Sequence, residues 1–223
     1  LPHIQAGTFK DGVEVLAHGR REGIFVLPHP SGRVLISVFA NNLQTTEWTT
    51  PSELLIADPM DLAAGVVSVD LGALPKPCVG AWELQALDPA ISKVALACDG
   101  SESIAVLSLP ADFATAPLAD VAQNVTGCGL NLAGDGWATQ FVSGDGAGGF
   151  LAVQSQLALP PKLWHVGANC SPSGIPAGDV PMALDQVRLL RQPVLLRPAG
   201  DKPPLWLVAA GPTDDGVVIV QGG

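Results

Sequence analysis

Histidine is the residue type in this chain best suited to acid–base or metal chemistry near neutral pH. Of the four histidines, His29 is the sharpest candidate for a general base or metal ligand, because it lies in a predicted loop between two apolar runs. The sequence places no serine, cysteine or acidic residue beside it. We therefore predict a turn residue, flanked by Pro28 and Pro30, whose ring caps the local backbone.

The other histidines show no paired spacing of the kind that metalloproteases use. His165 follows Trp164 within a predicted strand, which favours a packed or hydrogen-bonded histidine. His3 and His18 lie near the start of the chain, where exposure is expected.

Acidic residues form no recognisable catalytic or calcium-binding motif. Several Asp-Gly turns could supply oxygen ligands, and Asp135 with Asp145 marks the best candidate region for calcium. Asp-Gly is also favoured by turn geometry alone, so no catalytic, cofactor or metal residue is assigned. Carboxylates from separate strands could still meet at one face; the candidates are Glu47, Glu53, Glu83, Asp88 and Glu102.

Two further patterns favour structure over chemistry. The glycine-rich segment 143–149 lacks the Gly-Lys-Ser/Thr ending of a phosphate loop, so we predict a hairpin loop. Five tryptophans could form a binding surface for sugars or peptides, but packing between sheets is favoured, and the chain has no tyrosine. They are Trp48, Trp82, Trp137, Trp164 and Trp206.

Composition excludes some partners. The net charge is −10, from 11 basic and 21 acidic residues, and nucleic-acid binding requires clustered Lys and Arg. No apolar run approaches the ~20 residues that a membrane-spanning helix needs. A protein partner or a homo-oligomer therefore fits better than a nucleic acid or a membrane-spanning segment.

Four widely spaced cysteines indicate two disulfides, with three possible pairings. They are Cys78, Cys98, Cys128 and Cys170. No Cys-x-x-Cys motif or Cys/His cluster indicates zinc. Disulfides predict an extracellular or periplasmic location. The triplet Asn124-Val125-Thr126 fits the N-glycosylation pattern.

Apolar segments of strand length recur along the chain and alternate with Gly- and Pro-rich turns. The pattern predicts an all-β, propeller-like domain over 1–223, of about four blades of roughly fifty residues, with a β-sandwich as the alternative. The spacing of Cys78 and Cys128 suggests units at 22–72, 78–125, 128–170 and 182–221. Helical turns are expected only at Met60 to Ala64 and Asp112 to Ala116.

The predicted strands are 13–17, 23–27, 34–40, 53–57, 66–71, 80–87, 93–98, 103–109, 118–125, 130–133, 138–143, 149–155, 162–168, 186–190, 193–197, 205–210 and 217–221.

The segment "HPSGRVLISVFANN" resembles the turn-and-strand signature of the YVTN and lactonase-like β-propellers. Pro30 to Arg33 fill the turn, Val34 to Val38 the strand, and Asn41-Asn42 its end. Asp88-Pro89 opens a similar segment, which lacks the glycine because Ile91-Ser92 occupies that place. The resemblance covers about two of the four units. It implies a propeller fold and, as one possible activity, a hydrolase with a site in a central channel.

Because no reactive constellation is recognisable, the first functional hypothesis is a non-catalytic binding or scaffold domain, secreted or at a surface, within an assembly. The low charged fraction of 14% also fits a subunit packed against partners. The alternatives are a lactonase-like hydrolase and a coat or filament-decorating protein.

Overall fold

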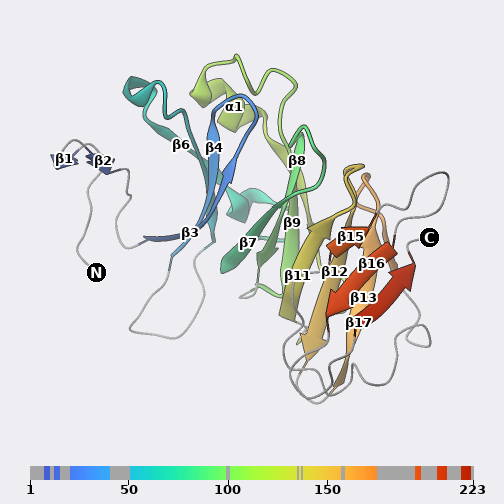
Figure 1. Ribbon diagram of the computed structural model, residues 1–223. Coiled ribbons are helices and arrows are strands. Elements are labelled where there is room, and N and C mark those ends of the chain that lie inside the picture. Colours follow the sequence, from blue (N-terminus) through green and yellow to red (C-terminus); the bar gives the residue numbers. More distant parts are fainter. Residues whose placement is uncertain are drawn as a thin grey trace.

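The computed structural model describes residues 8–10, 13–15, 21–40, 51–98, 101–134, 136, 138–156, 159–174, 194–196, 205–209 and 217–221. Within these ranges the chain is mainly antiparallel β-structure with one short α-helix (Figure 1). The strands are β1 (Thr8–Lys10), β2 (Val13–Val15), β3 (Arg21–Pro28), β4 (Val34–Ala40), β5 (Glu53–Ala57), β6 (Val66–Asp70), β7 (Ala81–Ala86), β8 (Lys93–Cys98), β9 (Ser103–Ser108), β10 (Thr126–Leu130), β11 (Ala138–Gly144), β12 (Phe150–Gln156), β13 (Leu159–Val166), β14 (Pro172–Gly174), β15 (Val194–Leu196), β16 (Leu205–Ala209) and β17 (Val217–Gln221). The helices are η1 (Leu62–Ala64), η2 (Leu71–Ala73) and α1 (Leu118–Asn124).

Consecutive strands pair with one another in every sheet. The first sheet is β3-β4-β5-β6, the second β7-β8-β9-β10, the third β11-β12-β13-β14 and the fourth β15-β16-β17, with β1-β2 as a separate hairpin. This up-and-down order is that of a propeller blade. None of the sheets closes on itself within the described ranges. The all-β class is thus confirmed.

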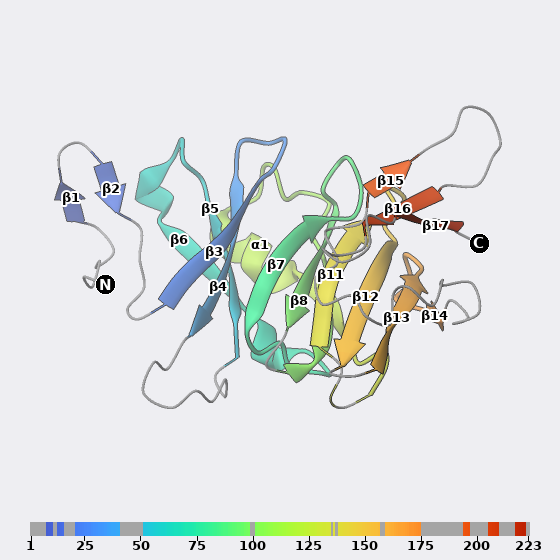
Figure 2. The same cartoon turned by 60° about the horizontal axis from the view of Figure 1, so that its bottom comes forward.

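The first three sheets are stacked face to face, with their first strands adjacent. Strand β7 contacts both β3 and β11, and Figure 2 shows these three strands side by side. One apolar core, which includes Leu54 and Leu96, fills the space between the first and second sheets. A second core, which includes Ile104 and Phe150, fills the space between the second and third sheets. Burial on both faces explains why strands such as β8 do not alternate apolar and polar residues.

The first strand of each of these three sheets contains a β-bulge at the same place. Ile24, Trp82 and Gln140 are the extra residues, because the register steps past them from one pair to the next. Successive bulges lie 58 residues apart (82 minus 24, and 140 minus 82). The repeat is therefore real, but its period is 58 residues instead of the expected fifty.

The boundaries of the second and third units differ from the prediction. The second sheet extends to Leu130, so Cys128 lies on its last strand, β10, and does not begin the third unit. Cys78, in contrast, precedes β7, the first strand of that sheet. The two cysteines are thus not equivalent. Segment 130–133, predicted as a strand, contributes only Leu130 to β10.

One predicted strand is a helix. Segment 118–125 forms α1, which is preceded by Pro117. Leu118 and Val121 are three residues apart and both enter the core between the first two sheets, as helical spacing requires. The turn predicted near Met60 is the 3-10 helix η1, whereas 112–116 forms turns without a regular helix. The predicted strand 186–190 lies outside the described residues.

Candidate functional site

Glu83 is the most unusual side chain of the described chain, because it is a carboxylate inside an apolar interface. It lies on β7, immediately after the bulge, and only 4% of its surface is exposed. Its register neighbours Ala97 and Ile104 belong to the core between the second and third sheets. At the equivalent register in the first and third sheets the sequence has Phe25 and Phe141.

Two hydrogen bonds hold the Glu83 carboxylate. Its Oε2 atom accepts from the Val142 backbone N–H at 3.0 Å, and its Oε1 atom accepts from Gln85 Nε2 at 3.3 Å. Val142 lies on β11, so the first bond joins the first strands of two neighbouring sheets. Burial raises the pKa of Glu83 from 4.5 to about 7, and the two hydrogen bonds oppose that rise. The group can therefore exchange a proton near neutral pH.

Glu83 has no metal-binding cluster around it in the part of the chain that the structure describes. No group of three or more His, Cys, Asp or Glu side chains is positioned to hold a metal ion there. Proton uptake and release at the junction of two sheets is the chemistry that the raised pKa of Glu83 supports.

His29 caps the turn between β3 and β4. Its Nδ1 atom accepts from the Ser31 backbone N–H at 3.1 Å and lies 2.8 Å from Ser31 Oγ. The ring contacts that of Phe113, with centroids 4.5 Å apart. Partial burial lowers the pKa of His29. The prediction of a turn residue whose ring caps local backbone is confirmed, but the expectation that no serine lies beside His29 is wrong, because Ser31 belongs to the same turn.

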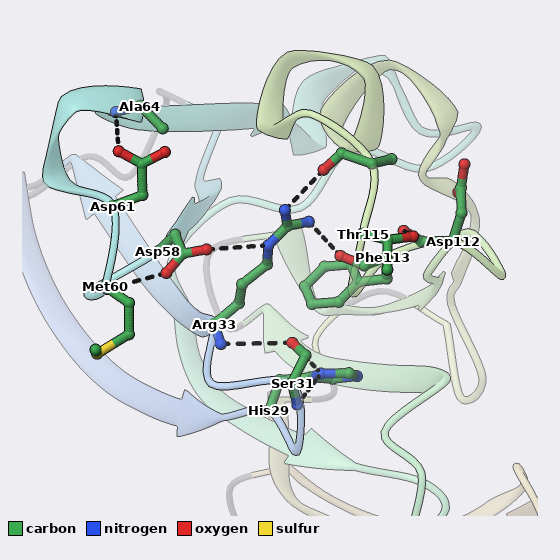
Figure 3. A network of polar contacts seen from close by, with 11 residues as sticks. His29, Ser31, Arg33, Asp58, Met60, Asp61, Ala64, Asp112, Phe113 and Thr115 are labelled. Atoms are coloured by element: carbon green, nitrogen blue, oxygen red, sulfur yellow. Dashed lines mark hydrogen bonds and ion pairs between the residues drawn. The ribbon is translucent and has the colours of Figure 1, made fainter.

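Arg33, at the end of the same turn, connects the first two sheets (Figure 3). Its guanidinium donates to the carbonyl oxygens of Phe113 and Ala116, in the loop between β9 and α1. Its Nε atom lies 3.6 Å from Asp58 Oδ2 in the first sheet's β5–β6 turn. Arg33 is buried, so these partners compensate a charge removed from water. The sequence indicated a turn here but not this connection.

Asp145 and His165 lie side by side at the corresponding end of the third sheet. His165 Nε2 lies 3.5 Å from Asp145 Oδ2. Asp145 Oδ1 also accepts from the backbone N–H groups of Ala147 and Gly149, which fixes the β11–β12 turn. The prediction of a hydrogen-bonded or packed His165 agrees with this pair. Asp135, the other calcium candidate, lies outside the described residues, as do His3 and His18.

The remaining candidate carboxylates are distributed over separate elements. Glu53 on β5 accepts from the Ser68 hydroxyl at 2.9 Å. Asp88 accepts from backbone N–H groups in its own β7–β8 turn, and its pKa is lowered because these hydrogen bonds outweigh the opposing effect of burial. Glu102 accepts from Gly136 N at 2.6 Å. Glu47 lies outside the described residues.

Trp164 is the tryptophan whose side chain is described, and it packs against the core between the second and third sheets. Trp82 and Trp206 lie on β7 and β16 and are described by their backbone only. Trp48 and Trp137 lie outside the described residues. For Trp164, inter-sheet packing is thus confirmed.

The four cysteines form two disulfides, as predicted, and the structure selects the pairing. Cys78–Cys98 joins the segment that precedes β7 to the end of β8, whereas Cys128–Cys170 joins β10 of the second sheet to the β13–β14 turn of the third. The interface between these two sheets is therefore connected at their first strands by the Glu83–Val142 hydrogen bond. The disulfide connects it at β10, the last strand of the second sheet. Two disulfides indicate an oxidising environment.

Comparison with known proteins shows no close relative. No protein-family model matches the chain, and no curated protein matches its sequence. A luciferin-regenerating enzyme superposes with a TM-score of 0.48 at 11% identity, covering 91% of this chain and 62% of that one. An engineered GH43 glycoside hydrolase with endo-xylanase and exo-arabinofuranosidase activity superposes with a TM-score of 0.39 at 10% identity, covering 91% and 40%.

This chain therefore spans less than two thirds of the length of either enzyme. Neither superposition reaches a TM-score of 0.5, so neither contributes to the argument about activity. The resemblance to YVTN and lactonase-like propellers stays a prediction at the level of the family.

Among the described residues, no helix is long and apolar enough to cross a membrane.

The period of 58 residues is the signal in the sequence that distinguishes Glu83 from the other carboxylates. Aligned at that period, the first strands place Phe25, Glu83 and Phe141 in one column. A single carboxylate in an otherwise aromatic column is a signal of function or of a special structural role.

Proposed function

We propose that this chain is a non-catalytic binding or scaffold domain with a propeller-like arrangement of sheets, which acts outside the cytoplasm within a larger assembly. The observation that carries the location is the disulfide between Cys128 and Cys170. It connects two separate sheets, so the fold depends on a bond that persists in secreted and periplasmic proteins but is rare in the cytosol.

The non-catalytic part of the proposal is supported by the structural use of the candidate reactive groups. His29 caps a turn, and Asp145 contacts His165. The Arg33 guanidinium binds two backbone carbonyls and lies beside a carboxylate. Glu83 is withdrawn from solvent and bonded to a neighbouring strand. A catalytic group must instead reach the reacting atoms of a substrate.

Native mass spectrometry and thiol analysis of the secreted protein test the two parts separately. We expect a non-reduced mass lower by four hydrogens than the reduced mass. We also expect a native mass above that of a single chain. Four thiols that can be alkylated in the unreduced protein would contradict the location. A strictly monomeric protein that binds no partner would contradict the assembly role.

A second candidate function is a lactonase-like hydrolase, and Glu83 is the observation in its favour. Its pKa of about 7 suits a general acid or base. A panel of lactones and esters should be assayed with the native protein and with Glu83→Gln. Turnover that is lost in a folded Glu83→Gln protein would establish the hydrolase with Glu83 in its site. Turnover that is absent from the native protein supports the binding role, whereas equal turnover in both proteins would contradict it and place the activity elsewhere.

A further inference from the structure

The N-glycosylation triplet lies at an exposed junction between a helix and a strand. Asn124 is the last residue of α1 and Thr126 is the first residue of β10. Both side chains are exposed, whereas Val125 between them is half-buried and donates its backbone N–H to Val121 O at 3.1 Å. The two residues that a glycan transferase must recognise are thus outside the core, and the middle residue fixes the chain between them.

The Asn124 amide can carry a sugar without losing its present contact. Its Nδ2 atom donates one hydrogen bond to Asp120 O, at 2.9 Å, one turn earlier in the helix. A carboxamide nitrogen has two hydrogens. Replacement of one by a sugar leaves the other for Asp120, so the modified residue fits the same helix end.

The disulfides are independent evidence for the compartment in which N-glycosylation takes place. Cys128 follows Thr126 by two residues and bonds to Cys170 across the sheets. The compartment in which secreted proteins form such bonds in eukaryotic cells, the lumen of the endoplasmic reticulum, is oxidising. N-glycosylation is a modification of secreted proteins, so both features belong to one secretory route.

We propose that Asn124 is an N-glycosylation site of this protein. An oligosaccharide bound to a lipid diphosphate is the donor. The bond from the sugar C1 to the diphosphate oxygen breaks, a C1–N bond to Asn124 Nδ2 forms, and the amide proton leaves as the lipid diphosphate is released. No oxidant or reductant takes part.

A second triplet, Asn169-Cys170-Ser171, provides an internal comparison on the same disulfide. Both Asn169 and Ser171 are exposed. However, Asn169 Oδ1 accepts from the Ser171 N–H at 3.1 Å, and Cys170 between them has a φ of 62° and is bonded to Cys128. Formation of this turn and of its disulfide competes with transfer to Asn169. We assign the glycan to Asn124 and not to Asn169.

A glycan at Asn124 would cover a strand edge. Strand β10 is the last in the order of the second sheet, and in the described ranges its outer edge pairs with no strand. Such edges invite pairing with other chains, and a bulky, hydrated group beside one opposes it. The assignment rests on the extracytoplasmic location proposed above, and it implies that the protein partner binds away from the α1–β10 junction.

Secretion of the full chain from a cultured eukaryotic cell tests the assignment. Intact mass would be measured before and after peptide-N-glycosidase, which converts a modified asparagine to aspartate, and peptide mapping would locate the change. We expect one oligosaccharide, at Asn124, on the native protein. Thr126→Ala and Asn124→Gln should remove it, whereas Thr126→Ser, which keeps a hydroxyl, should retain it.

The outcomes separate this proposal from the location. A secreted protein with both disulfides formed but with unmodified Asn124, or with sugar on Asn169 alone, would overturn the glycosylation site and leave the location standing. A protein with four free thiols would overturn the location itself. Equal thermal midpoints of Thr126→Ala and Thr126→Ser after deglycosylation would show that a lost glycan does not reflect a misfolded variant.

Discussion

Replacement of Glu83 by glutamine should remove a pH dependence of stability that this residue imposes on the fold. Glutamine keeps the shape of the side chain and can still accept from the Val142 N–H, which is bonded to Glu83 Oε2 at 3.0 Å. Its amide nitrogen would face Gln85, whose own carboxamide can rotate to present its oxygen. The substitution thus removes a titrating group from the interface between the second and third sheets while conserving its contacts.

The magnitude follows from the pKa of the folded state. Burial raises the pKa of Glu83 from 4.5 to about 7, so between these values the folded chain holds a proton that the unfolded chain releases. The free energy of unfolding therefore falls as pH rises, by about 3 kcal/mol over this window. The contribution is complete below pH 4.5 and is lost as pH rises through 7.

Urea unfolding at pH 4.5, 6, 7 and 8, with the disulfides intact, measures this effect. We expect Glu83→Gln to equal the native protein within about 1 kcal/mol at pH 4.5 and to exceed it by about 3 kcal/mol at pH 8. Glu53→Gln is the matched control, because Glu53 also lies on a strand and accepts a hydrogen bond, from Ser68. The control keeps Glu83, so it should keep the fall in stability with rising pH that Glu83 causes.

A difference between the native protein and Glu83→Gln that is the same at every pH would refute the reasoning. So would a variant that is less stable than the native protein at pH 8. Either result would mean that the carboxylate is charged and well compensated in the folded state, and that the apolar surroundings of Glu83 do not control its ionisation.

Three further variants test the connections between sheets. Arg33→Lys should lower the free energy of unfolding by about 2 kcal/mol in urea titrations, because one ammonium cannot replace a fork that reaches two carbonyls and Asp58; an unchanged midpoint would contradict this. Cys128→Ser with Cys170→Ser should cost about 4 kcal/mol by the same assay, for a sequence separation of 42, and a loss below 1 kcal/mol would count against the staple. Gly144→Ala should lower the thermal midpoint, at a cost of about 1–3 kcal/mol, since a Cβ there would collide with the Ala86 carbonyl oxygen; equal melting would disprove the close approach of β7 and β11.

Much of the sheet structure follows from the local sequence. Strands β4, β5 and β8 begin and end at the predicted residues, because each is a short apolar run bounded by turn residues. The echo of the His29–Arg33 turn in the segment Leu87–Lys93 is also confirmed. Both turns are closed by the same backbone hydrogen bond, from the first residue's N–H to the last residue's carbonyl.

The errors arose where distant contacts decide the structure. Segment 118–125 has the composition of a strand, but the core between the first two sheets selects the helical spacing of Leu118 and Val121. The predicted repeat rests on Cys78 and Cys128, yet Cys78 precedes a first strand and Cys128 lies on a last strand. No local signal in the sequence distinguishes those two positions.

The candidate site was even less accessible to sequence reasoning. Glu83 is one of the five candidate carboxylates, and its importance depends on its burial and on a bond to Val142, 59 residues away. Arg33 was recognised as a turn residue, but its partners Phe113 and Ala116 are about 80 residues distant. Such pairings come from the stacking of sheets, which the local pattern does not contain.

In each of the first three sheets, the turn between the first and second strands is closed by a backbone hydrogen bond, so its loop can be replaced. The same backbone hydrogen bond closes each turn, and it connects His29 to Arg33, Leu87 to Lys93 and Asp145 to Gly149. The turns contain three, five and three residues between these pairs. The second and third turns are neighbours, since Gly146 N–H and Gly148 N–H donate to Leu87 O. A new loop of different length could therefore be grafted between any of these pairs without a shift in strand register. One end of the molecule can thus diversify in sequence while the sheets that support it stay the same.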